Sequence, residues 1–275
     1  MRAFLLTSLT MVAFASNSIL NRAAVDAGHA DPAAFALVRV LAGVVVLCII
    51  LTLRGGKLDV RNPKRWGGAV ALSVYMIGFS LAYVSLDAGV GALILFGTVQ
   101  IALFAHSAWT GEPPNRGQNI GAAIAFAGLL LALWPDQDPV GSMSGAFFML
   151  AGGLGWAAYT LAGRGAKDPI GVTASHFLLS LPMLAVLLLV PDLDMSATGW
   201  ALAILAGGIT SGLGYALWYS VLPSLPGARA AIVQLSVPVL AILMGAALLG
   251  EPVSFKVIVS AGLVLGGIGM ALRAG

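Results

Sequence analysis

Charged residues are scarce in this sequence: Asp, Glu, Lys and Arg together make up 9% of its 275 residues. A typical soluble domain contains about 25% of them, and the mean hydropathy of this chain is +0.98. So little polar surface cannot keep a chain of this length in water. This excludes a soluble enzyme, a disordered protein and a nucleic-acid-binding protein, and the composition predicts a polytopic membrane protein.

Residues that build metal and disulfide sites are also scarce. Cys48 is the single cysteine, so we expect neither a disulfide framework nor a cysteine-ligated metal site. His29, His106 and His176 are far apart in sequence and match no metal-binding spacing. We expect no metal and no cofactor. The sequence has no Gly-x-x-x-x-Gly-Lys motif and no Asp or Glu in the middle of a predicted span, so neither ATP nor a carboxylate proton relay is predicted to drive the protein.

Ten apolar segments are long enough to cross a bilayer as helices, each of which needs about 20 residues. Pro, Gly and charged residues separate them. We expect helices near residues 3–20, 33–53, 67–86, 90–109, 116–134, 143–162, 171–190, 198–220, 229–248 and 254–272. The first segment also has features of a cleaved signal peptide at Ala13-Phe14-Ala15, but its counterpart in the repeat described below favours a retained helix. The predicted fold class is an all-α integral membrane protein.

The basic residues gather on one side of the predicted membrane. With the N-terminus in the cytoplasm, all but three of the Lys and Arg residues fall inside. The exceptions are Arg22 and Lys256, which fall outside, and Arg39, which lies within the second span. This bias predicts that both termini are cytoplasmic. The short loops and the absence of targeting segments favour the inner membrane of a bacterium.

The chain contains an internal repeat. The matched positions are the turns Gly111-Glu112-Pro113 and Gly250-Glu251-Pro252, and Gly78, Phe79 and Tyr83 with Gly214, Tyr215 and Tyr219 at identical spacing. We therefore predict two repeats of five spans, residues 1–137 and 138–275. An odd number of crossings inverts the second half relative to the first, and inverted repeats are typical of secondary transporters.

Two inverted five-helix repeats, each with a Gly-Glu-Pro turn before a final glycine-rich helix, resemble the drug/metabolite transporter superfamily, and in particular its EamA-type branch. The resemblance covers the whole chain. It implies a basket of ten helices around a central cavity that moves small metabolites, and amino-acid and amine exporters are common in that branch. We expect a small-molecule substrate and the lipid bilayer as partners, no nucleic acid, and a monomer or a weak dimer.

Aromatic side chains at helical spacing are candidates for binding a solute. They share stripes on the third, sixth and eighth spans. These candidates are Tyr75, Phe79, Tyr83, Trp156, Tyr159, Tyr215, Trp218 and Tyr219. Aromatic faces with hydroxyl tips suit amphipathic solutes or cations. The alternative is a lipid-facing anchor at the membrane interface, which applies most to Tyr83 and Tyr219 near the ends of their spans.

Polar residues inside the predicted spans are the other candidates. Asn17, Gln100 and Gln234 either contact substrate or only join helices through hydrogen bonds. Arg39 either binds a carboxylate or gates the cavity, or else it reaches the outer headgroups or a loop Asp. His176 matches Arg39 from the second half, and is either a proton-sensitive gate or a packed neutral histidine.

The two Gly-Glu-Pro turns, residues 111–113 and 250–252, are predicted to be structural. Pro is expected to start the next helix at its first position, and Glu to favour the dipole at that helix N-terminus. The chain as a whole is predicted to export small metabolites, above all neutral or aromatic amino acids, by alternating access. The alternative within this class is efflux of drugs, amines or other metabolites. An intramembrane enzyme and a channel are the alternatives from other classes.

Overall fold

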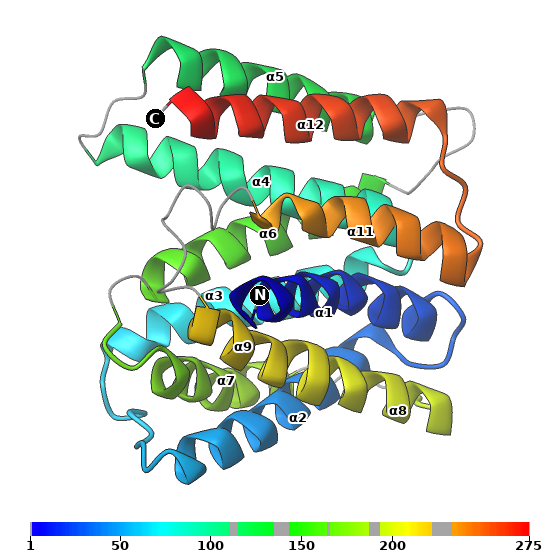
Figure 1. The fold of residues 1–275 in the computed structure, drawn as a ribbon. Coiled ribbons are helices and arrows are strands. Elements are labelled where there is room, and N and C mark those ends of the chain that lie inside the picture. The colour runs from blue at the N-terminus through cyan, green and yellow to red at the C-terminus, as the bar shows by residue number, and fades with distance from the viewer. Residues whose placement is uncertain are drawn as a thin grey trace.

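The computed structural model describes residues 2–110, 115–134, 143–163, 166–186, 193–221 and 233–274, which form helices packed side by side (Figure 1). The first helices are α1 (Arg2–Val25), α2 (Pro32–Leu53), α3 (Lys64–Ala82), α4 (Ala88–Trp109) and α5 (Arg116–Leu133). They are followed by α6 (Met143–Gly163), α7 (Pro169–Ala185), α8 (Ala197–Ile204), the π-helical segment η2 (Leu205–Leu213), α9 (Gly214–Val221), α11 (Ser236–Met244), the π-helical segment η4 (Gly245–Leu249) and α12 (Phe255–Ala274). No β-strand occurs in the described residues.

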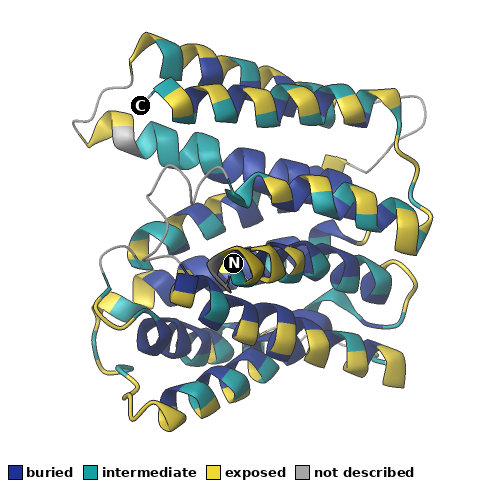
Figure 2. Ribbon diagram, viewed as in Figure 1, coloured by how far each residue is buried: buried dark blue, intermediate teal, exposed yellow. Residues whose placement is uncertain are grey.

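Among the described residues, six helices are long and apolar enough to cross a bilayer. They are Phe4–Val25, Pro32–Leu53, Ala88–His106, Met143–Gly163, Ala197–Trp218 and Phe255–Ala274. Two shorter apolar helices are Pro169–Ala185 and Ser236–Leu249. Large apolar side chains such as Phe147, Leu248 and Phe255 are exposed along the outside of the bundle, where Figure 2 shows many exposed positions on its helices. An outer surface of this kind suits contact with lipid.

Two matching Asp-Pro pairs start helices α2 and α7. The Asp31 carboxylate accepts hydrogen bonds from the backbone of Ala33 and Ala34 at 2.8 and 3.2 Å, and Asp168 likewise caps α7. The Pro that follows each Asp is the first helical residue, where its missing N–H costs no hydrogen bond. Local sequence alone therefore determines where these two helices begin.

Helices from the two halves of the chain pack against each other in matched pairs. α5 packs on α12, as the top of Figure 1 shows, α4 packs on α11, and α2 packs on α7. α3 packs along α6, and α1 packs in the same way along the continuous run α8–η2–α9. If each helix of the first half is exchanged with the matching helix of the second half, the same packed pairs result.

The eighth predicted span is one continuous helical run, but its middle is the π-helical segment η2. Gly207 in this segment lies against the backbone carbonyl of Arg39, so a Cβ at Gly207 would overlap α2. A π-helical turn re-aims the side chains on a helix and is frequent at functional sites. Here it turns Thr210 and Ser211 toward α1, where both bond to Asn17.

The turn at Gly250-Glu251-Pro252 differs from the prediction. Gly250 ends η4 in the left-handed conformation at φ 69°, which glycine adopts without strain. The prediction that Pro252 is the first residue of the next helix is wrong, because α12 begins at Phe255 and Ser254 caps it by accepting from Val257 N at 3.2 Å.

Glu251 stabilises a different helix N-terminus from the expected one. Its carboxylate accepts a 2.7 Å hydrogen bond from Ala88 N, so it lies at the start of α4 rather than of α12. Because Glu251 is drawn toward α4, the chain stays non-helical as far as Ser254. The first turn, Gly111, Glu112 and Pro113, lies outside the described residues.

Candidate functional site

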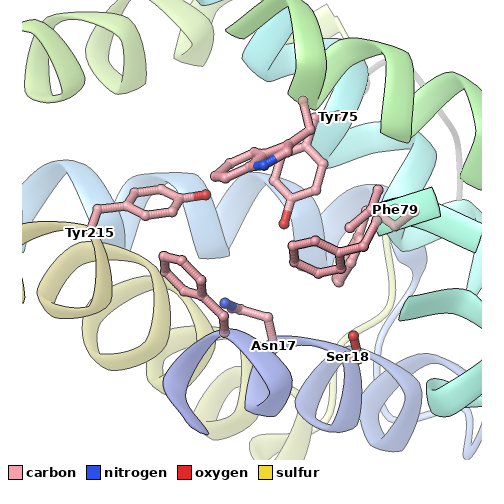
Figure 3. Close-up of a pocket in the computed structure, with 9 residues that line it drawn as sticks. Asn17, Ser18, Tyr75, Phe79 and Tyr215 are labelled. Carbon is pink, nitrogen blue, oxygen red and sulfur yellow. The ribbon is translucent and has the colours of Figure 1, made fainter. Parts of the chain in front are cut away.

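A cavity lies inside the bundle between helices of both halves (Figure 3). Its lining residues are Phe14, Asn17 and Ser18 of α1, Tyr75 and Phe79 of α3, Leu95 and Phe96 of α4, Trp156 of α6, and Tyr215 of α9. The cavity volume is ≈ 20 Å³, which is room for about one water molecule. A metabolite could therefore enter only if side chains or helices move apart.

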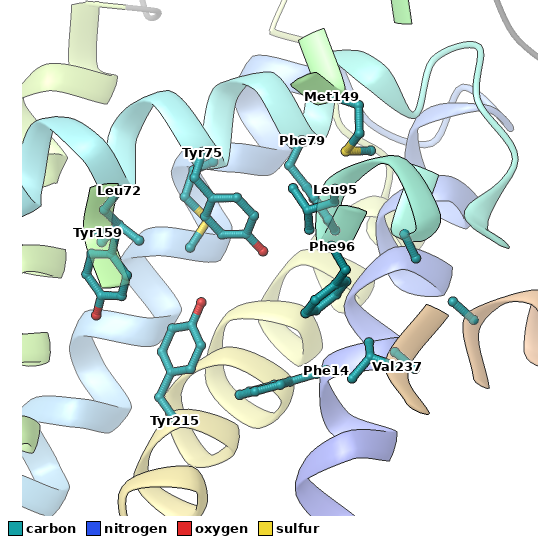
Figure 4. Packing of buried hydrophobic residues seen from close by; sticks show 14 of the residues in the cluster. Phe14, Leu72, Tyr75, Phe79, Leu95, Phe96, Met149, Tyr159, Tyr215 and Val237 are labelled. Atoms are coloured by element: carbon teal, nitrogen blue, oxygen red, sulfur yellow. The ribbon is translucent and has the colours of Figure 1, made fainter. Parts of the chain in front are cut away.

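Aromatic rings form most of the cavity wall. Trp156 stacks on Tyr215 with ring centroids 5.4 Å apart, and Tyr75 lies 4.9 Å from Trp156 and 5.3 Å from Phe79. Phe14 meets Tyr215 edge to face at 5.7 Å. The hydroxyl ends of Tyr75 and Tyr215 point into the space between the helices (Figures 3 and 4). Such a wall suits a flat apolar group that carries a polar end.

Asn17 supplies the polar part of the cavity lining. Its Oδ1 accepts hydrogen bonds from Thr210 Oγ1 at 2.6 Å and from Ser211 Oγ at 3.2 Å. Its Nδ2 makes only long hydrogen bonds, of 3.4 Å, to the carbonyls of Ala13 and Thr210. The amide oxygen therefore joins α1 to η2, while the amide nitrogen is weakly held beside the cavity.

Arg39 does not line the cavity but contacts the residues that do. Its Nε donates to Ser211 Oγ at 3.2 Å and its Nη2 donates to the Tyr75 hydroxyl at 3.1 Å. The guanidinium carbon lies 4.9 Å from the Phe79 ring centroid and 5.6 Å from that of Tyr75. Arg39 is fully buried, so it does not snorkel toward the headgroups as the alternative interpretation required.

Tyr83 and Trp218 lie beside the cavity. Tyr83 is fully buried, meets Phe79 edge to face at 4.8 Å, and donates a 3.4 Å hydrogen bond to the Ala88 carbonyl. This burial contradicts the alternative in which Tyr83 is a lipid-facing anchor. Trp218 is buried against Phe14 at 6.1 Å. The side chain of Tyr219 lies outside the described part of the structure.

Tyr159 and His176 form a neighbouring cluster rather than part of the cavity wall. The Tyr159 hydroxyl donates to Thr173 Oγ1 at 3.2 Å, and its ring meets His176 edge to face at 5.5 Å. The His176 ring packs against Gly68 of α3, and neither ring nitrogen has a hydrogen-bond partner among the described residues. Both residues were predicted to line the cavity. Tyr159 instead packs against Trp156, so the pair lies behind a residue of the cavity wall and not in the wall itself.

Gln100 and Gln234 are half-buried, and neither lines the cavity. On α4 the cavity is instead lined by Leu95 and Phe96, and Phe96 is one helical turn before Gln100. On α4 the sequence predicted the polar residue Gln100 and did not predict the apolar residues Leu95 and Phe96.

Phe14 and Ser18 of α1 also line the cavity and were not among the predicted binding residues. The repeat contains a signal for Phe14, because its matched position in the second half is Trp156. Ser18 is adjacent to Asn17 in the sequence. No pattern in the sequence separates Ser18 from other small residues of the same helix.

A cluster of charged residues is centred on Arg22, which lies on α1 one helical turn beyond the cavity residue Ser18. Its other members are Asp26, Asp87 and Glu251. Arg22 nitrogens lie 2.9 Å from Asp26, 3.5 Å from Asp87 and 3.7 Å from Glu251, and Arg22 also donates to the Tyr83 carbonyl at 3.0 Å. This Arg22 cluster joins α1 to the start of α4 and to the turn after η4. Burial raises the pKa of Glu251 and of Asp87, although Arg22 opposes the shift in both.

The model of the EamA-like transporter family matches residues 1–134 and 143–273. The chain belongs to the EamA-like transporter family. An uncharacterised protein of Pseudomonas aeruginosa is 46% identical to this EamA-like transporter over 277 residues, 98% of this chain and 94% of that protein. The chain is therefore a membrane transporter and not an enzyme.

More distant relatives are named as transporters. An uncharacterised transporter of Archaeoglobus fulgidus is 26% identical over 88% of this chain and 89% of its own. YedA, an uncharacterised inner membrane transporter of Escherichia coli K12, is 27% identical over 81% of this chain and 76% of its own. A crystal structure with 19% sequence identity matches the EamA-like transporter at a TM-score of 0.68, covering 98% of this chain and 97% of the other, and shows the fold alone.

Proposed function

We propose that this EamA-like transporter exports small metabolites, above all neutral or aromatic amino acids, by alternating access and without ATP. The observation that carries the proposal is the cavity itself. Stacked rings such as Trp156 and Tyr215 lie beside the amide of Asn17, so an apolar body and a polar end both find partners. Substrate would bind there, with Asn17, Tyr75, Phe79, Trp156 and Tyr215 as its contacts.

The movement proposed is a rocking of two inverted halves, residues 1–137 and 138–275, around this cavity. The exchange symmetry of the helix pairs supports it, as does the match of the family model to two separate stretches of the chain. Side chains from both halves line the cavity. A relative motion of the halves would therefore open it to one side and then to the other.

The proposed topology has ten crossings with both termini in the cytoplasm of a bacterium. Asp31 and Arg54 flank α2, whose 22 residues span about 33 Å. Basic residues follow Arg54 in the connection to α3, whereas the Arg22 cluster lies at the end of α1 near Asp31. The positive-inside rule then puts the Arg22 cluster on the outer side. Labelling of a tag after Gly275 from outside intact cells would contradict this orientation.

Counterflow in proteoliposomes tests the transport function. The purified protein is reconstituted, the vesicles are loaded with one unlabelled amino acid at a time, and uptake of labelled phenylalanine is followed. Transient accumulation that depends on the trapped amino acid is the expected result for an amino-acid carrier. No accumulation from correctly inserted protein would move the assignment to amines or other metabolites, for which aromatic faces are also suited. A leak that is independent of the trapped solute would indicate a channel.

A further inference from the structure

The guanidinium of Arg39 is buried in the bundle and has no counter-ion among the residues that the structure describes. Its two hydrogen-bond acceptors, the hydroxyls of Ser211 and Tyr75, are neutral, and its Nη1 has no hydrogen-bond partner in the part of the chain that the structure describes. No described carboxylate lies within ion-pair distance of it. The two N–H groups of Nη1 therefore make no hydrogen bond, and the positive charge has no counter-ion, among the described residues.

A buried charge without a partner is costly in a membrane protein. The described carboxylates that form ion pairs are engaged elsewhere, Asp26, Asp87 and Glu251 with Arg22 and Asp59 with Arg65. The ring of Phe79 and the hydroxyl groups reduce the cost but do not neutralise the charge. A negatively charged group on the substrate would supply the missing counter-ion and so would explain why an arginine is buried here.

Each neighbour of Arg39 leads to the cavity. Tyr75 and Phe79 line the cavity directly, and Ser211 donates to Asn17, which also lines it. The guanidinium is thus one side chain away from the cavity at Tyr75 and at Phe79, and two side chains away through Ser211 and Asn17. Because the closed cavity holds about one water, a substrate must displace rings of this wall, and displacing Tyr75 or Phe79 uncovers the guanidinium.

The cavity wall offers a cation aromatic faces but no carboxylate to pair with. The nine lining residues include no Asp, Glu, Lys or Arg, so an ammonium group meets rings, hydroxyls, an amide and the aliphatic side chain of Leu95. A carboxylate, in contrast, matches the fork of the guanidinium, which presents paired donors to two oxygens. The two ends of an amino acid are therefore recognised unequally.

We propose that Arg39 makes the cavity selective for an apolar or aromatic body that bears a carboxylate, and that the amino group of the cargo is dispensable. This inference rests on the proposed function, since it uses the same cavity as the cargo site. It separates amino acids and their des-amino acids, which carry the carboxylate, from amines, which lack it.

Three compounds that share a phenyl ring and a two-carbon linker test the proposal. They are phenylalanine, 3-phenylpropionate and 2-phenylethylamine, and their Kd values are measured from ligand-induced thermal stabilisation of the purified full-length protein. We expect the first two to bind and the amine to bind about tenfold or more weakly, as expected for loss of a charged hydrogen bond. In Arg39→Gln the difference between acid and amine should disappear, whereas Arg54→Gln, an exposed arginine just after α2, should retain it.

The comparison of the three compounds on the unaltered protein stands even if Arg39→Gln does not fold. Amine binding as tight as acid binding would overturn the inference, and phenylalanine counterflow would then show whether the proposed function survives. If phenylalanine binds but 3-phenylpropionate does not, the inference is also overturned, because the amino group is then required. If no compound binds and no counterflow is seen, both the inference and amino-acid export are wrong.

Discussion

Thr210 donates a 2.6 Å hydrogen bond to the amide oxygen of Asn17 and so ties the π-helical part of the eighth span to the first helix. The two residues are 193 positions apart. Asn17 lines the cavity at the same time. The side chain predicted either to contact substrate or to join helices is therefore placed for both roles.

Removing this hydrogen bond should destabilise the fold. In Thr210→Val the Asn17 oxygen keeps only its bond to Ser211, and interhelical hydrogen bonds in membranes average about 0.6 kcal/mol with a maximum near 1.7 kcal/mol. We expect the free energy of unfolding in detergent to fall by about 1 kcal/mol. Thr52→Val, which removes an exposed bond within α2, is the matched control. Equal losses in the two variants would show that the hydrogen bond between Thr210 and Asn17 adds nothing beyond an exposed bond within a helix.

Truncating the aromatic wall should weaken substrate binding. Phe79→Ala and Tyr215→Ala each remove a ring from the cavity, and aromatic contacts contribute about 0.5–1.5 kcal/mol. We expect the apparent KM for labelled phenylalanine in counterflow to rise roughly twofold to tenfold. Phe147→Ala removes an exposed ring from α6 and should leave the KM unchanged. Unchanged transport in both cavity variants, with correct insertion, would exclude this wall as the binding surface.

With both termini in the cytoplasm, as proposed, Arg22 should hold the outer side of the cavity closed. Arg22→Gln leaves Asp87 and Glu251 partly buried without their cation, which favours opening by about 1 kcal/mol, or roughly fivefold. Accessibility is measured in a Cys48→Ala background with Ser18→Cys in the cavity wall, from its rate of labelling by an impermeant maleimide added outside cells.

The control for this experiment is Arg61→Gln, which removes an exposed arginine in the connection before α3. Its labelling rate should equal that of the parent. A rate in Arg22→Gln that does not rise above the control would show that the Arg22 cluster is not a gate.

Acid should favour the closed state. Burial raises the pKa of Glu251 and of Asp87 above their ordinary values, and opening returns both to water. The closed form therefore binds protons more tightly, so its extra stability is complete below the ordinary pKa range and is lost as pH rises through the raised values. The labelling rate of Ser18→Cys, divided by the rate in the same protein with Asp87→Asn and Glu251→Gln, should rise with pH. A ratio that is constant or falls with pH would contradict this sign.

Several features of the site were predictable because they depend on local pattern. Phe79 and Tyr215, which the spacing of the repeat matches, both line the cavity, and so does Asn17, which was selected for its polarity inside an apolar helix. Gln100 was chosen by the same rule, but the cavity is lined by Leu95 and Phe96 on that helix. Polarity alone does not reveal which face of a helix meets a cavity, because that face is determined by the neighbouring helices.

The turn after η4 also combines a feature that the local sequence predicts with one that depends on a distant helix. Its left-handed glycine at Gly250 was marked by the repeat, but the role of Glu251 depends on Ala88, 163 residues away. No local rule could assign a carboxylate to a helix N-terminus so distant in sequence.

By itself the sequence determined the all-helical apolar character of the chain, the caps that start α2 and α7, and the family resemblance, since composition, helix caps and spacing act over a few residues. The tertiary structure alone decided which helix faces meet. It buried Arg39 against Tyr75 and Ser211, residues 36 and 172 positions away, and left its Nη1 without a partner in the described part of the chain. The reason is physical: the cost of a buried charge depends on what surrounds it, and helices far apart in the chain supply those surroundings.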